Sequence, residues 1–136
     1  MNDKLYTLIP WDRLRDLIKM NFDINFNKID DLCIPDIKWF SLENWLNADD
    51  LEILQCLESL YPFWGELMIV TDASYTKELS PFMVNSVHIG QFVKNHFSNF
   101  NQHFLETDAF IINFESKIAW LFHHEGIYGL AKYNKK

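Results

Sequence analysis

Five histidines are the residues whose chemistry first suggests a metal centre or an acid–base catalyst. His123 and His124 are adjacent, and adjacent side chains of a strand point to opposite faces, so one metal ion cannot readily bind both. His96 falls on an apolar helical stripe, where a histidine hydrogen-bonded to backbone is the common arrangement. The sequence contains no H-E-x-x-H or C-x-x-C spacing. We therefore expect no metal site and no cofactor.

Paired carboxylates and activated nucleophiles are the other routes to catalysis, and the sequence assembles neither. Glu115 and Glu125 fall at opposite ends of one predicted strand. At about 3.3 Å per residue they stand roughly 20 Å apart, too far for two cooperating carboxylates. No G-x-S-x-G turn presents a serine, and the four glycines are too scattered to cradle a phosphate. We expect that the protein is not an enzyme.

The charge pattern indicates binding. The formal net charge is −7, yet the segment from Asp23 to Asp72 holds eleven acidic residues against two lysines, which makes that segment −9. An acidic, aromatic-rich surface suits a basic protein partner, because charge complementarity speeds association. Acidic residues in the first turn of a helix also have a purely structural explanation, since they complement the helix dipole. Aromatic residues of this acidic segment include Trp39, Trp45, Tyr61, Phe63 and Trp64.

Length and composition restrict the class of protein. With 136 residues, 49% of them hydrophobic, we expect one globular domain spanning residues 1–136. No apolar run approaches the roughly 20 residues of a membrane span, and no secretory signal is visible. Cys33 and Cys56 are therefore expected to be reduced, in a cytoplasmic protein. The acidic balance argues against direct binding to nucleic acid or to an anionic membrane.

Helical spacing and helix-stop signals predict the helices that would position these residues. One helix begins near Pro10, and a helix capped by Asn47 carries Asp49 and Asp50 in its first turn and ends before Pro62. A short helical turn is predicted from Ser41 to residue 46. Another helix is predicted from Ser80 onward, with an apolar stripe that runs to residue 100.

A period of two predicts a strand meander at the C-terminal end, over residues 109–114, 117–124 and 127–132. Two-residue turns at 115–116 and 125–126 would place Tyr128 and Leu130 on the same face as Phe110 and Leu121. Residues 67–70 predict a further buried strand. Because both faces of the meander are apolar, both need covering. We expect an α+β fold, an antiparallel sheet of about four strands packed with three to four helices.

The residues of this meander resemble the closing strands of small bacterial immunity proteins. The likeness lies in the strand Asp108-Ala-Phe-Ile-Ile-Asn-Phe and in a second strand that ends in His124-Glu125. Such proteins are paired with contact-dependent growth inhibition and other polymorphic toxins. The resemblance implies a non-enzymatic inhibitor that binds the C-terminal effector domain of its cognate toxin in the cytosol. Many such effectors are nucleases with basic clefts, which an acidic surface would fit.

The acidic segment and the resemblance together predict an inhibitory face with one aromatic hot spot and several carboxylates. The residues of this predicted face are Glu43, Trp45, Asp49, Asp50 and Glu52. A second candidate patch lies at the strand end, although a solvated hairpin is its simpler interpretation. The residues of this second patch are His123, His124 and Glu125.

Two other classes of function stay open. The chain fits an adaptor that binds a cationic peptide or protein unrelated to toxins, and a neighbouring toxin gene would argue against that class. It also fits an enzyme whose site is assembled from scattered residues, with His96, His123 or His124 as the acid–base group. Alanine at each histidine would test that class. The two-sided apolar sheet permits a dimer as readily as a monomer.

Overall fold

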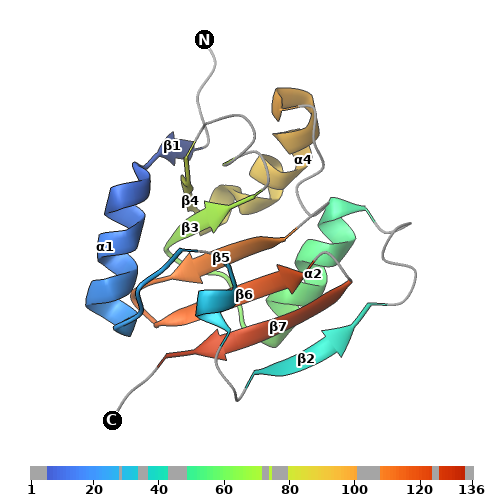
Figure 1. Cartoon of the computed structure of the whole chain (residues 1–136). Helices are drawn as coiled ribbons and strands as arrows, with labels where there is room; N and C mark the ends of the chain where they lie inside the picture. Colours follow the sequence, from blue (N-terminus) through green and yellow to red (C-terminus); the bar gives the residue numbers. More distant parts are fainter. Residues whose placement is uncertain are drawn as a thin grey trace.

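In the computed structural model, the described residues form one open antiparallel sheet of seven strands (Figure 1). The structure describes residues 6–27, 29–33, 37–42, 49–71, 74, 80–100, 108–123 and 126–133, with backbone only at residues 29, 30 and 96–100. The strand order across the sheet is β1-β4-β3-β5-β6-β7-β2. The strands are β1 (Tyr6–Leu8), β2 (Lys38–Ser41), β3 (Glu66–Val70), β4 (Phe82–Asn85), β5 (Ala109–Asn113), β6 (Ile118–His123) and β7 (Ile127–Lys132). The helices are α1 (Trp11–Phe22), α2 (Asp50–Leu60) and α4 (Ile89–Phe100), with 3-10 turns η1 (Ile29–Leu32) and η3 (Ser86–His88).

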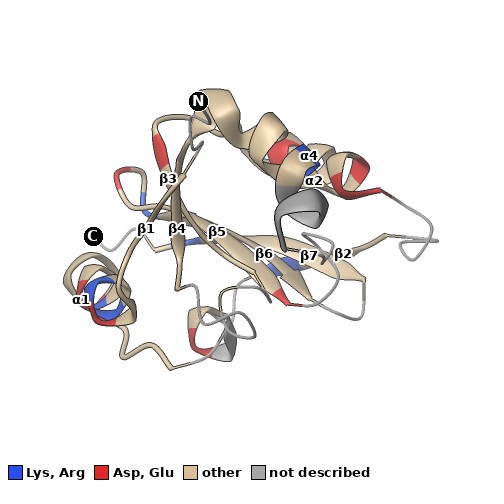
Figure 2. Ribbon diagram, turned by 90° about the horizontal axis from the view of Figure 1, so that it is seen from above, with Lys and Arg blue, Asp and Glu red and all other residues tan. Residues whose placement is uncertain are grey.

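Helices cover both faces of the sheet, so the molecule has three layers (Figure 2). On one side, the α1 face, Leu14 and Ile18 of α1 pack with Leu32 of η1 against the sheet. On the other side, the α2 face, Leu57 of α2 and Phe92 of α4 pack against it. The strands between the layers are apolar on both sides. The predicted α+β class is confirmed, and so is the need to cover both faces of the meander.

The register of the meander agrees with the prediction in one hairpin and differs in the other. β5 and β6 pair as expected, with Asn113 opposite Ile118. In the second hairpin His123 lies opposite Ile127, so three residues connect the strands and not two. Gly126 has φ +82°, the left-handed conformation that three-residue hairpin connections favour near their end. This shift of one residue moves Tyr128 to the α2 face, so its predicted face was wrong.

The predicted count of about four strands was also wrong, because β1, β2 and β4 were missed. Each has only three or four residues. Phe82 begins a strand that pairs with β3 and β1, so the helix predicted from Ser80 begins at Ile89. Ser41 is the last residue of β2, and the rest of the helical turn predicted from it, residues 43–46, lies outside the described residues. Strands this short are held by the neighbours with which they pair, and they show no period of their own.

Tyr133 closes the α1 face beside the end of β7. Its ring stacks on Phe22 with 4.1 Å between centroids, and its hydroxyl donates to the carbonyl oxygen of Leu32 at 2.5 Å. Burial, with a smaller contribution from Cys33, raises the pKa of the Tyr133 phenol well above its ordinary value. The phenol is therefore held in its neutral form in the folded protein.

We expect the variant Tyr133→Phe to lose about 1 kcal/mol of unfolding free energy at neutral pH, because the Leu32 carbonyl loses its donor. The raised pKa of Tyr133 means that its stabilising contribution is complete below pH ~10 and is lost as the pH rises above that value. Stability should therefore fall more steeply above pH ~10 in the wild type than in the variant. Urea unfolding across the alkaline range measures both slopes. Equal slopes would contradict this assignment.

Candidate functional site

The first turn of α2 holds three of the predicted carboxylates together. Asp49 is the N-cap, and its Oδ1 accepts a hydrogen bond from the backbone N–H of Glu52 at 2.8 Å. Glu52 Oε1 accepts in turn from the backbone N–H of Asp49 at 3.0 Å. This reciprocal capping box fixes both carboxylates at the exposed helix end, while Asp50 lies half-buried beside them. The prediction that Asn47 caps the helix was wrong, because Asp49 takes that position.

The rest of α2 adds negative charge and no positive charge. Among its 11 residues are Asp50, Glu52 and Glu58, and none is lysine, arginine or histidine. Glu58 is exposed, and so is Leu51. Figure 2 shows acidic residues at the end where α2 begins. We call Asp49, Asp50, Glu52 and Glu58 the α2 acidic face.

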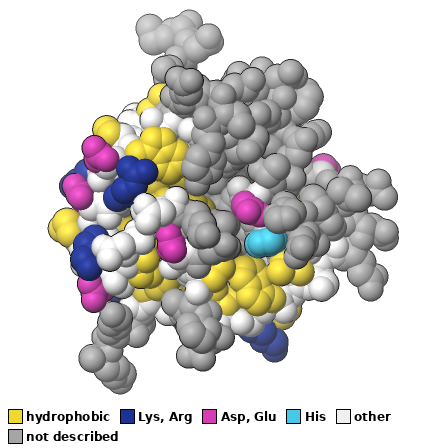
Figure 3. Space-filling view, in the orientation of Figure 1, with side chains coloured by type: hydrophobic (Ala, Val, Ile, Leu, Met, Phe, Trp, Pro, Cys, Tyr) yellow, Lys and Arg dark blue, Asp and Glu magenta, His cyan; other side chains and the backbone are white. Residues whose placement is uncertain are grey.

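The surface of α1 differs from the α2 acidic face because its charges are mixed. Arg15 Nη1 lies 3.2 Å from Asp12 Oδ1, and Lys19 Nζ lies 3.0 Å from Asp23 Oδ1. Figure 3, which looks onto this side of the molecule, shows acidic and basic side chains interspersed over α1. Neighbouring charges of opposite sign largely cancel at a distance. Of the described helices α1 and α2, α2 is therefore the one whose negative charge is not balanced by neighbouring cations.

The acidic segment does not form one surface, because it passes around an edge of the sheet. η1 packs on the α1 face through Leu32, β2 is the edge strand, and α2 packs on the α2 face. Glu43 and Trp45, the other members of the predicted inhibitory face, lie outside the described residues. The structure thus brings Asp49, Asp50 and Glu52 together and adds Glu58. The helical spacing of Leu51, Gln55 and Glu58, all exposed, is the sequence signal that would have found Glu58.

The aromatic residues of the acidic segment divide into packed and exposed ones. Tyr61 and Phe63 are half-buried against Trp120, with ring centroids 6.2 and 4.8 Å away. Trp64 is 40% exposed, at the connection from α2 to β3. Trp39 of β2 is half-buried on the α1 face. Of these four side chains, Trp64 and Trp39 are therefore available to a partner without disturbing the core around Trp120.

The second candidate patch is represented by one described residue, since His124 and Glu125 lie outside the described residues. His123 is at the end of β6, and its Nδ1 lies 3.9 Å from Asp108 Oδ1, with side chains 24% and 35% exposed. The two atoms are too far apart for a hydrogen bond. The contact is an ion pair only with a protonated imidazole. Within the part of the chain that the structure describes, no group of three His, Cys, Asp or Glu residues is placed to hold a metal ion.

The described fold is that of an α+β protein with three layers, in which α2 is strongly acidic. Comparison with protein-family models, with curated proteins and with solved structures gave no match. None of the described helices combines the length and the apolar character that crossing a membrane requires.

Proposed function

We propose that this chain is an immunity protein that binds a basic toxin effector domain through the α2 acidic face. The observation that carries the proposal is a helix whose exposed side and first turn bear carboxylates and no cation. The resemblance of the C-terminal meander to immunity proteins supports the same function. Carboxylates in this arrangement can replace the phosphates that a nuclease cleft attracts.

The capping box suits such an interface because it holds Asp49 and Glu52 in place before the partner arrives. Carboxylates that are already ordered lose little conformational freedom on binding. Exposed ion pairs contribute little stability individually, so the main effect of these charges is on association rate and on the choice of partner. Leu51, which is exposed beside them, provides an apolar contact within the acidic face.

The test is a variant that removes the four charges while keeping the shapes of the side chains. Its substitutions are Asp49→Asn, Asp50→Asn, Glu52→Gln and Glu58→Gln. Asparagine caps helices well and glutamine still serves in a capping box, so α2 should keep its fold. We expect association with the effector domain encoded beside this gene to slow by about tenfold or more at low ionic strength. Stopped-flow association rates at low and high salt would measure this loss and the weaker salt dependence.

A matched control removes four charges outside α2. Its substitutions are Asp12→Asn, Asp16→Asn, Asp23→Asn and Glu115→Gln. We expect this control to associate at nearly the wild-type rate. Equal slowing in both variants would show that only net charge matters and would refute the α2 acidic face. Failure of the wild-type protein to bind would refute the immunity function. Binding without protection of cells from the effector would favour an adaptor.

A further inference from the structure

The outer edge of β2 offers backbone groups that no described strand uses. β2 is the last strand of the sheet in the described part of the chain, and it pairs with β7. The backbone N–H of Leu42 donates to the carbonyl oxygen of Gly126 at 2.9 Å. Along an antiparallel ladder, hydrogen-bonded pairs of residues alternate with non-bonded pairs. Because Leu42 and Gly126 are bonded, Phe40 and Tyr128, two residues along the ladder, form the next bonded pair. The N–H and C=O groups of Trp39 and Ser41 must therefore point away from β7.

Aromatic side chains flank this edge on both faces of the sheet. Trp39 lies over Gly129, where a Cβ atom would come within 3.2 Å of Trp39 Cε3 and 3.0 Å of the Lys38 carbonyl oxygen. Phe40 stacks on Tyr128 on the α2 face, with 5.6 Å between ring centroids. Both aromatic residues of β2 are half-buried. A strand added beside β2 would thus meet an aromatic ring on each face.

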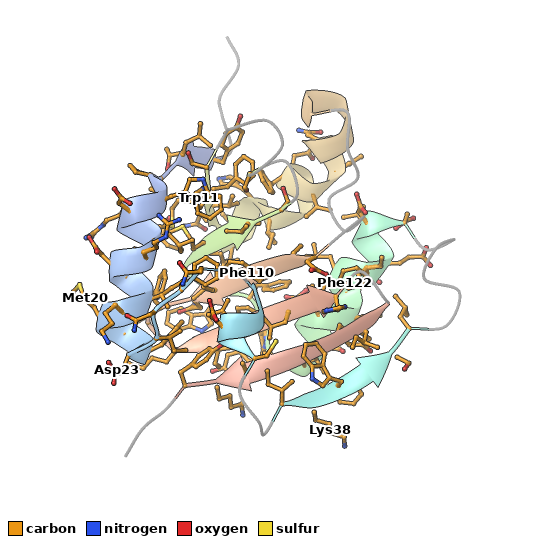
Figure 4. All side chains as sticks on the ribbon, in the orientation of Figure 1. Trp11, Met20, Asp23, Lys38, Phe110 and Phe122 are labelled. Atoms are coloured by element: carbon orange, nitrogen blue, oxygen red, sulfur yellow. The ribbon has the colours of Figure 1, made fainter. Side chains whose placement is uncertain are left out.

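Exposed sheet edges are usually protected by a very short strand, by lysine or other charges, by prolines or by bulges. β2 has the first two of these, a length of four residues and Lys38, and lacks the others. The pairing of β2 with β7 continues from Lys38 to Ser41 without a bulge, and β2 contains no proline. Its one charged residue, Lys38, has its Nζ 5.5 Å from the centre of the Phe40 ring, at the rim of the sheet in Figure 4. This edge can accept another strand.

Charge decides which strand fits. The sequence around β2 is acidic, because Asp36 and Glu43 stand on either side of Lys38, and the α2 acidic face follows β2 in the chain. Pairing of two copies at β2 would bring two such segments together, and like charges repel. An extended segment flanked by lysine or arginine is attracted instead.

We propose that the outer edge of β2 binds an extended, basic strand of the partner and extends the sheet by that strand. Backbone hydrogen bonds to Trp39 and Ser41 hold the strand, and the rings of Trp39 and Phe40 select its side chains. The proposal rests on the proposed function, since the same basic effector domain is the partner. It adds the place and the backbone conformation of the bound segment.

Residue-resolved amide hydrogen exchange tests this docking in the wild-type protein, alone and bound to the effector domain encoded beside this gene. We expect the amides of Trp39 and Ser41 to exchange rapidly in the free protein and slowly in the complex. The amide of Phe40 should be protected in both states, because it is bonded to β7. This alternation is specific to strand addition, since simple coverage of the surface would not follow the ladder.

The variant Ser41→Pro removes one outward N–H and leaves the ladder with β7 intact. We expect it to bind the effector domain about tenfold or more weakly, because one bond is lost and the ring obstructs the edge. Leu8→Pro is the matched control on the opposite edge. The Ile9 N–H donates to the Pro81 carbonyl oxygen at 2.9 Å, so the N–H of Leu8 also points outward. This control should bind like the wild type.

Tight binding with no new protection at Trp39 and Ser41 would overturn strand addition and leave the inhibitor function intact. The exchange pattern decides this even if Ser41→Pro fails to fold. Failure of the effector domain to bind the wild type would refute the proposed function, and this inference with it. A dimer of the free chain that Ser41→Pro dissociates would show that a second copy occupies the edge, contrary to the proposal.

Discussion

Replacing Trp120 with alanine is expected to lower the unfolding free energy by about 3–5 kcal/mol, a large part of the stability of a domain of this size. Trp120 lies in the middle of β6 and is fully buried. Its Nε1–H donates to the Tyr61 carbonyl oxygen at 3.0 Å, and the ring packs against Tyr61 and Phe63. The variant leaves a cavity beside the connection from α2 to β3 and a carbonyl without its donor.

Trp64→Ala is the matched control for this prediction, because Trp64 is exposed and its backbone contact survives the substitution. We expect it to change the unfolding free energy by about 0.5 kcal/mol or less. Urea titrations followed by far-ultraviolet circular dichroism would compare the two variants. If both variants lose a similarly small amount of unfolding free energy, Trp120 does not stabilise the core as predicted.

The second large effect is expected at Asn113, a polar residue that is only 1% exposed. Its Nδ2 donates to the Trp64 carbonyl oxygen at 2.7 Å, and its Oδ1 accepts from the Ser116 backbone N–H at 2.9 Å. The side chain thus ties the β5–β6 turn to the connection from α2 to β3. We expect Asn113→Ala to cost about 2–4 kcal/mol, because two backbone groups lose their partners together.

Asn95→Ala serves as its control, since the Asn95 side chain accepts from Gln91 Nε2 at 2.9 Å on the exposed side of α4. The control should cost about 0.5 kcal/mol or less. Urea titration gives both values, and hydrogen exchange at Ser116 should accelerate only in Asn113→Ala. If Asn113→Ala is no more costly than the control, the two contacts of Asn113 do not hold these loops together.

The parts of the fold with long, regular signals could be predicted from the sequence. Pro62 marked the end of α2, which ends at Leu60 as predicted. The period of two found β5, β6 and β7, and the turn at residues 115–116 gave the β5–β6 register. These predictions succeeded because each depends on contacts between residues close in sequence.

The remaining errors concern contacts between distant residues and connections of uncertain length. β1 and β2 are strands because they pair with β4 and β7, which the local sequence does not show. One extra residue in the β6–β7 connection reversed the faces of β7. For the candidate site, the sequence revealed the excess of negative charge. It did not reveal that the acidic segment passes around the sheet edge, or that Trp39 lies over Gly129.

The strand order has a consequence for how the chain is made. β2 leaves the ribosome well before β7, with which it pairs, because Ser41 lies opposite Ile127. Closing so long a loop is slow compared with forming a local hairpin. The nascent chain therefore carries β2 without a partner for most of its synthesis, exposed to chaperones and to neighbouring nascent chains. β2 is thus made before the strands β3 to β7, yet it can join the sheet only after β7 has been made.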